Sequence, residues 1–145
     1  MERVARSIFI FVFVFFLSKG MVAQNSPEST IKSVLSNLID YSKNKSYDKA
    51  AKLIAYTGED SKRVDKDSFN PVNKDELNQV KRICKKISAL LELSGSHELG
   101  DYKVSGEAGK EEYTMHVTFV SGDQKLVTVF NFVKTEKGYL FTNMN

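Results

Sequence analysis

The stretch that decides the fold is residues 111–134, EEYTMHVTFVSGDQKLVTVFNFVK. Large apolar side chains alternate with small or polar ones on both sides of a Ser-Gly-Asp-Gln segment. This period of two predicts two strands, and Gly122-Asp123 fits the two-residue loop of an antiparallel hairpin. In the register that this loop sets, one face carries consecutive apolar-dominated pairs: Phe119 with Leu126, Val117 with Thr128, Met115 with Phe130, and Tyr113 with Phe132.

Two further strands are predicted to flank the hairpin. Upstream, aromatic and apolar residues begin to alternate with polar ones near Leu99. Downstream, a turn at 136–138 leads to a short strand in which Phe141 shares the face of Phe132. We therefore expect an antiparallel meander of about four strands with one aromatic face.

Three helices are predicted before the strands. The first spans 26–44 and is capped by Ser26, and a second, shorter one begins after Ser46 and ends by Gly58. The third begins at Asn73, which stands three residues before a Glu in the spacing of a capping box. The apolar stripes of the first and third helices are Ile31, Val34, Leu35, Leu38 and Ile39, and Leu77, Val80, Cys84, Ile87 and Leu91.

The predicted fold class is α+β, with three N-terminal helices packed on a curved antiparallel sheet of about four strands. The apolar helix stripes and the aromatic sheet face would bury one another. Residues 57–72 are polar and form a loop that is long enough for partial structure or for a mobile flap.

The N-terminus has the order of a secretory signal peptide. Arg3 and Arg6 precede an unbroken apolar run over 8–17, and a short polar segment follows. A helix of this length covers about 15 Å, roughly half of a bilayer core, so a stable membrane span is the poorer interpretation. We expect a signal peptide at 1–23, cleaved after Ala23 or after Gly20, and one exported domain at 24–145 in the periplasm or outside the cell.

Charge and composition exclude several classes of protein. Removal of the leader turns 21 basic and 18 acidic residues into 18 and 17, so the net charge falls from +3 to +1. Such a balance gives no support for a nucleic-acid partner. A single cysteine cannot form an internal disulfide, and the position of Cys84 in a helical stripe predicts a buried thiol.

Three stretches resemble a known superfamily. They are the segment 47–53 (YDKAAKL) after a leading helix, the hairpin 111–134, and the segment 138–141 (GYLF), in which many relatives have Trp in place of Tyr139. Together they are similar to the nuclear-transport-factor-2-like superfamily of cone-shaped α+β proteins with a cystatin-like fold. Within it, the chain resembles a secreted bacterial subgroup known as a domain of unknown function.

The resemblance implies a conical pocket between the curved sheet and the helices, and often a homodimer through the sheet. Enzymes of this superfamily generally place Asp, His or Tyr groups in that pocket. The residues expected to line it here offer one phenol and no carboxylate: Tyr113, Met115, Val117, Phe130, Phe132 and Phe141.

No catalytic, cofactor-binding or metal-binding set is predicted. His116 should point away from the aromatic face, and His97 lies on another element, so the two give no ligand spacing for zinc. The acidic residues at 59–67 and 111–112 do not follow the pattern of a calcium loop. The basic residues at 81–86 are interpreted as a solvated helix face, with anionic envelope polymer or lipid headgroups as the alternative.

The leading hypothesis is an exported, non-enzymatic binding module that holds a small apolar or aromatic ligand or a protein partner. The first alternative is a small isomerase or hydratase of the same superfamily that uses Tyr113 and an acid from 57–72. The second is a structural dimerisation domain without a pocket, since the other face of the sheet is partly apolar.

Overall fold

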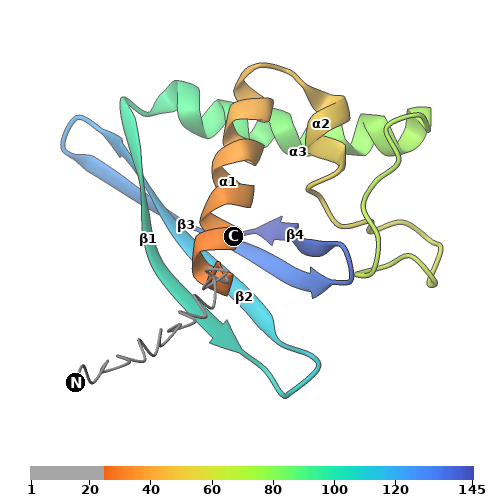
Figure 1. Ribbon diagram of the computed structural model, residues 1–145. Coiled ribbons are helices and arrows are strands. Elements are labelled where there is room, and N and C mark those ends of the chain that lie inside the picture. Colours follow the sequence, from red (N-terminus) through yellow and green to blue (C-terminus); the bar gives the residue numbers. More distant parts are fainter. Residues whose placement is uncertain (1–24) are drawn as a thin grey trace, which may run out of the picture.

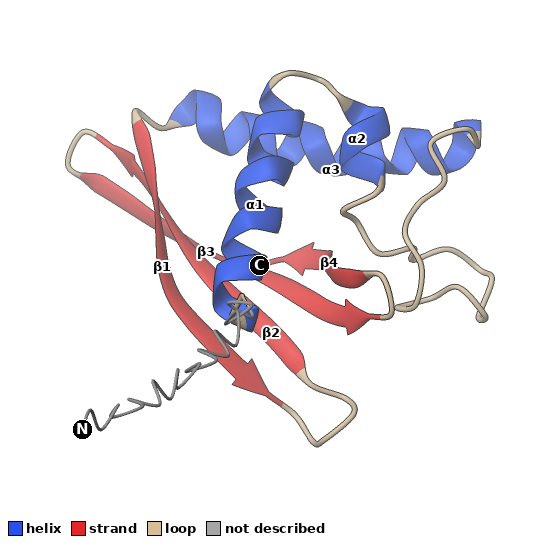
Figure 2. Cartoon of the chain, in the orientation of Figure 1, coloured by secondary structure: helices blue, strands red, loops and turns tan. Residues whose placement is uncertain are grey.

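The computed structural model describes residues 25–145, so the predicted leader at 1–23 lies outside the described residues. Figure 1 shows helices on one side of an open, twisted sheet, and Figure 2 shows the same arrangement by type of element. The order of elements is α1 (Pro27–Lys43), α2 (Tyr47–Ala51), α3 (Lys74–Leu93), β1 (Ser96–Ser105), β2 (Glu112–Ser121), β3 (Gln124–Thr135) and β4 (Gly138–Met144). The predicted α+β class is confirmed.

The sheet is an antiparallel meander in the order β1-β2-β3-β4. The central hairpin has the predicted register, with Met115 opposite Phe130 and Tyr113 opposite Phe132. Phe141 lies opposite Phe132, so it is on the predicted face. The tight turn requires a left-handed residue, which Gly122 supplies with φ 57°.

The first strand begins three residues before Leu99, where the prediction placed its start, and it contains a bulge that the sequence did not suggest. Leu99 pairs with Val117 and Tyr102 pairs with Met115, so β1 has one more residue than β2 in this interval. The extra residue keeps both Leu99 and Tyr102 on the face that packs against the core.

Helices α1 and α3 follow their predictions closely. The side chain of Ser26 caps α1 by accepting a hydrogen bond from the backbone of Ser29, and the side chain of Asn73 caps α3 by accepting from Asp75 and Glu76. Cys84 is fully buried in the core, as its place in the stripe predicted.

The predicted extent of the second helix is wrong. Helix α2 ends at Ala51 instead of continuing to Gly58. Residues 53–55 run along the free edge of β4, where the Ala55 amide donates to the Phe141 carbonyl and the Phe141 amide donates to the Leu53 carbonyl, both at 2.8 Å. This pairing satisfies the edge of β4, which a longer helix would leave open.

The core lies between the helices and the inner face of the sheet. Its largest fully buried side chains come from α1, α3, the sheet, the 53–55 segment, which contributes Ile54, and the 57–72 loop, which contributes Phe69. Within residues 25–145, no helix is both long and apolar enough to cross a membrane.

Candidate functional site

The six residues predicted to line a pocket come together on the inner face of the sheet. All are buried, and Tyr113 is the most exposed of them at 7%. Their rings pack on one another, with 5.7 Å between the centroids of Phe130 and Phe141 and 6.0 Å between those of Phe132 and Phe141. Their role as the lining of a ligand pocket stays a prediction.

Tyr113 is accompanied by other tyrosines and not by an acid from the 57–72 loop. Its ring meets that of Tyr139 edge to face at 4.9 Å between centroids. Burial raises the pKa of Tyr113, and the neighbouring Tyr139 and Glu111 raise it further. Burial likewise raises the pKa of Tyr102. These phenols therefore stay protonated at neutral pH, and the structure does not assemble the predicted pair of a tyrosine and a loop acid.

A groove of about 650 Å³ lies in another part of the molecule. We call it the α1–α3 groove. Its lining comes from the end of α1 and its connection to α2, the C-terminal half of α3, and the segment 94–97 that leads into β1. The polar and charged side chains in it are Asp40, Lys43, Lys45, Tyr47, Lys85, Ser88, Glu92, Ser94, Ser96 and His97.

The groove has fixed walls and an apolar floor. The Ser88 hydroxyl on α3 donates to the Ser42 carbonyl of α1 at 2.9 Å, which ties the two walls together. Ile39 and Leu91 form part of the floor and also belong to, or pack on, the hydrophobic core. At the far end, the ring of His97 packs against the ring of Phe119. The groove is therefore built on rigid elements.

The connection at the rim has an unusual backbone. Ser46 donates its amide to the Tyr41 carbonyl and Lys45 donates to the Ser42 carbonyl, which is the pattern of a Schellman motif. In this motif the residue after the C-cap is left-handed and is usually Gly. Here it is Lys45, with φ 57°. The chain therefore holds a lysine side chain at the groove in a conformation that costs about 1–2 kcal/mol for an L-residue.

The groove and the tyrosine cluster are well separated. Segment 94–97 meets β2 at Phe119, which pairs with His97, whereas Tyr113 lies six residues earlier on the same strand. At about 3.3 Å per residue, the two places are roughly 20 Å apart. A ligand in the groove would thus lie outside the aromatic face that the sequence indicated.

Two other hollows are described. One of about 590 Å³ lies on the other flank of α3 against the β2–β3 hairpin, where Leu93 and Leu126 are exposed. The second, of about 300 Å³, is polar; Asp65, Glu112 and Asn131 line it, together with Phe132 from the predicted pocket set.

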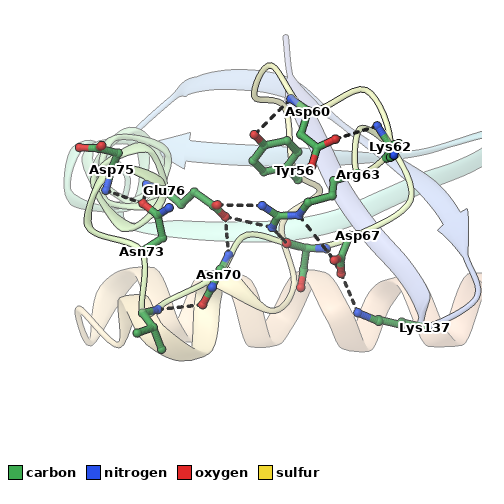
Figure 3. Close-up of polar contacts among 12 residues, drawn as sticks. Tyr56, Asp60, Lys62, Arg63, Asp67, Asn70, Asn73, Asp75, Glu76 and Lys137 are labelled. Atoms are coloured by element: carbon green, nitrogen blue, oxygen red, sulfur yellow. Dashed lines mark hydrogen bonds and ion pairs between the residues drawn. The ribbon is translucent and has the colours of Figure 1, made fainter.

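The 57–72 loop is anchored by a buried carboxylate (Figure 3). Glu76 accepts two hydrogen bonds from the Arg63 guanidinium, at 2.8 and 3.1 Å, and one from the Asn70 amide at 2.6 Å. Arg63 also donates to the Ser68 carbonyl at 3.0 Å and stacks on the Tyr56 ring, 4.0 Å from its centroid. The loop is thereby fixed to the N-terminus of α3 and does not have the contacts of a free flap.

The electrostatics of this anchor are those of a structural ion pair. The hydrogen bonds from Arg63 hold the pKa of Glu76 below its ordinary value against the opposing effect of burial. Lys137 similarly lowers the pKa of Asp67, whose carboxylate it contacts at 2.6 Å. The capping-box prediction was thus half right, because Asn73 caps α3 but the Glu76 side chain turns to Arg63 instead of to the backbone amide of Asn73.

The two histidines that were candidates for a site lie apart from each other. His116 lies on the outer face of the sheet opposite Val129, as predicted, while His97 is at the groove. Within residues 25–145, no three His, Cys, Asp or Glu side chains gather in a way that could hold a metal ion.

Sequence reasoning missed the groove because its lining comes from the ends of three elements. Lys85 belongs to the basic helix face that was interpreted as solvated, yet it lines the groove. The neighbouring Lys81 lies over the Tyr47 ring at 6.0 Å. One feature of the sequence could have indicated the groove. Lys45 follows the end of a helix, at a position where Gly or Asn is usual.

No protein-family model and no curated protein matches this sequence. Among solved structures, the chain is similar to a Campylobacter jejuni protein named as a candidate NTF2-like transpeptidase, with 8% identity, a TM-score of 0.49, and coverage of 79% of this chain and 99% of that chain. It is also similar to an NTF2-like protein with a cystatin-like fold from Novosphingobium aromaticivorans, with 13% identity, a TM-score of 0.45, and coverage of 81% and 79%.

A third similar chain is an Rd1NTF2 variant, with 12% identity, a TM-score of 0.47, and coverage of 81% of this chain and 96% of that chain. The descriptions of all three chains contain the term NTF2.

Proposed function

We propose that this chain is an exported, non-enzymatic binding module that holds a small organic ligand in the α1–α3 groove. The observation that carries the proposal is the groove itself: about 650 Å³, an apolar floor and a rim of charged side chains on joined helices. Ligand sites in proteins generally have volumes of about 300–1,000 Å³, mostly apolar walls and a few polar groups that orient the ligand. Export is supported by the signal-peptide pattern of residues 1–23.

The proposal is non-enzymatic because the groove lacks the features of an acid–base site. A catalytic base is generally oriented by a hydrogen bond or ion pair from a second polar side chain. Within residues 25–145, the ion pairs are made by Lys32, Arg63 and Lys137 with their acidic partners, and none of them joins two side chains of the groove. The arrangement therefore favours binding over proton transfer.

Native mass spectrometry of residues 24–145, purified gently from an exporting host, tests this proposal. We expect a mass excess that disappears on denaturation. The variant Ala89→Trp fills the groove from α3 and should abolish that excess. Asn78→Trp is the control, because it puts the same side chain on an exposed site of α3, eleven residues or about 16 Å earlier. Retention that survives Ala89→Trp would contradict the groove as the site.

A homodimer through the outer face of the sheet stays a prediction. That face has Val127 at 53% exposure beside the half-buried Val129 and Val133. The same mass spectra report the oligomeric state, so a dimer would appear as a doubled mass, with or without a ligand.

A further inference from the structure

We infer that the ligand of the α1–α3 groove is an organic anion with an apolar body and a single negative charge, which Lys43, Lys45 and Lys85 bind. This inference rests on the proposed function of the groove and adds the chemical class of the ligand. It rests on three observations: the groove lysines are outside the described ion pairs, the backbone of Lys45 is left-handed, and the lining has an excess of positive charge.

The three groove lysines approach from two walls. Lys43 and Lys45 come from the end of α1 and the connection that follows it, and Lys85 comes from α3. Within residues 25–145, the ion pairs are made by Lys32, Arg63 and Lys137, so the groove lysines have no carboxylate within 4 Å. Their charge is thus available to a ligand.

Lys45 gives an independent reason to assign these lysines to binding. Its φ of 57° is a conformation in which glycine is usual, and Asn the most common alternative. Nothing in the helix end requires a long cationic side chain there, because the Schellman hydrogen bonds use only backbone atoms. Strained residues cluster at functional sites, where the strain is offset by what the side chain does.

The balance of charge limits the ligand to one negative group. The lining contains three lysines against the two carboxylates of Asp40 and Glu92, an excess of one positive charge among these five groups. Glu92 lies seven residues after Lys85 on α3, about 10 Å along the helix axis. An anion held among the lysines would place the far end of its body toward Glu92, where a second negative group would be repelled.

The apolar floor argues for an amphipathic molecule and against a fully polar anion. Ile39 is 4% exposed, and Leu91 is half-buried beside it in the groove. Burial of an alkyl chain against such a surface contributes about 0.8 kcal/mol per CH₂ group. A medium-chain carboxylate combines both features.

Isothermal titration of residues 24–145 with three probes of matched chain length tests the inference: decanoate, decanedioate and decyltrimethylammonium, each below its micelle-forming concentration. We expect decanoate to bind at least about tenfold more tightly than either of the others, with an affinity that falls as salt rises. Lys45→Gln and Lys85→Gln should each lower the affinity for decanoate by about three- to tenfold. Lys110→Gln, an exposed lysine in the β1–β2 loop, should change nothing.

Each other outcome is decisive. Equal binding of the three probes, all lost in Ala89→Trp, would overturn the charge inference and leave the groove as the site. Absence of any binding would also overturn the inference, while the mass excess measured separately would still decide the proposed function. Binding to vesicles of anionic phospholipid without binding to monomeric decanoate would assign the lysines to a membrane surface and overturn the inference as well.

Discussion

The substitution Glu76→Gln tests the anchor of the 57–72 loop. The Glu76 side chain is 10% exposed and its carboxylate accepts three hydrogen bonds, two of them from Arg63. A Gln amide has one acceptor oxygen, so its NH₂ group must face an N–H donor of Arg63 or of Asn70. One donor is then left without a partner, which costs about 1–3 kcal/mol. The loss of charge weakens the bonds that remain, and we expect a total loss of about 2–3 kcal/mol in the free energy of unfolding.

The matched control is Glu28→Gln. Glu28 is likewise an acid in the first turn of its helix, and it contacts Lys32 at 2.7 Å. The exposure of this second pair, above 40% for both side chains, is the main difference between the two sites. Exposed pairs of this spacing contribute at most about 0.5 kcal/mol. The difference between the two variants therefore isolates the effect of burial and of the additional contacts.

Urea unfolding followed by far-ultraviolet circular dichroism measures both variants. We expect Glu76→Gln to lower the midpoint without a change in the slope, and Glu28→Gln to leave both unchanged within error. Hydrogen exchange at the Asn70 amide, which donates to Glu76, should become faster in Glu76→Gln alone. If the two variants have equal stability, the ion pair does not anchor the loop and the reasoning is refuted.

Further predictions concern acid, strain and burial. Because folding lowers the pKa of Glu76, the stability that its charged carboxylate provides is complete above the ordinary value of 4.5 and is lost as pH falls through the pKa of the folded state. Glu76→Gln should therefore lose less stability on acidification than the native chain, as measured by urea titrations at successive pH values. Lys45→Gly should raise the free energy of unfolding by about 0.5–1 kcal/mol, because the relief of left-handed strain exceeds the entropic cost of glycine. The same variant should bind decanoate more weakly. A lower free energy of unfolding would show that Lys45 is not strained. Cys84, buried and with a pKa raised by burial, should react with Ellman's reagent only after unfolding. Phe132→Ala should cost about 3–5 kcal/mol in urea unfolding, whereas a cost near 1 kcal/mol would contradict its close packing on Phe141.

The parts of the fold that follow from local pattern could be predicted. The hairpin could be predicted because a two-residue turn fixes the register, and the register fixes which side chains share a face. Helices α1 and α3 could be read because their caps and apolar stripes lie within a few residues of one another. These features depend on contacts that are short in sequence.

What could not be predicted depends on distant segments. The early end of α2 results from the pairing of residues 53–55 with β4, more than eighty residues later. The ion pair of Arg63 with Glu76 joins a loop to a helix start, and the usual local interpretation of Glu76 was a capping box. The α1–α3 groove likewise exists only once the ends of α1, α3 and the start of β1 have met.

Amide chemical shifts report which residues a bound ligand contacts. The measurement is a two-dimensional ¹⁵N–¹H spectrum of residues 24–145 recorded during a titration with decanoate. We expect the largest shifts at Lys43, Lys45, Ser88 and His97, which line the groove, and no comparable change at Tyr113. Shifts centred instead on Tyr113 and its neighbours on the inner face of the sheet would place the site in the aromatic core and rule out the groove.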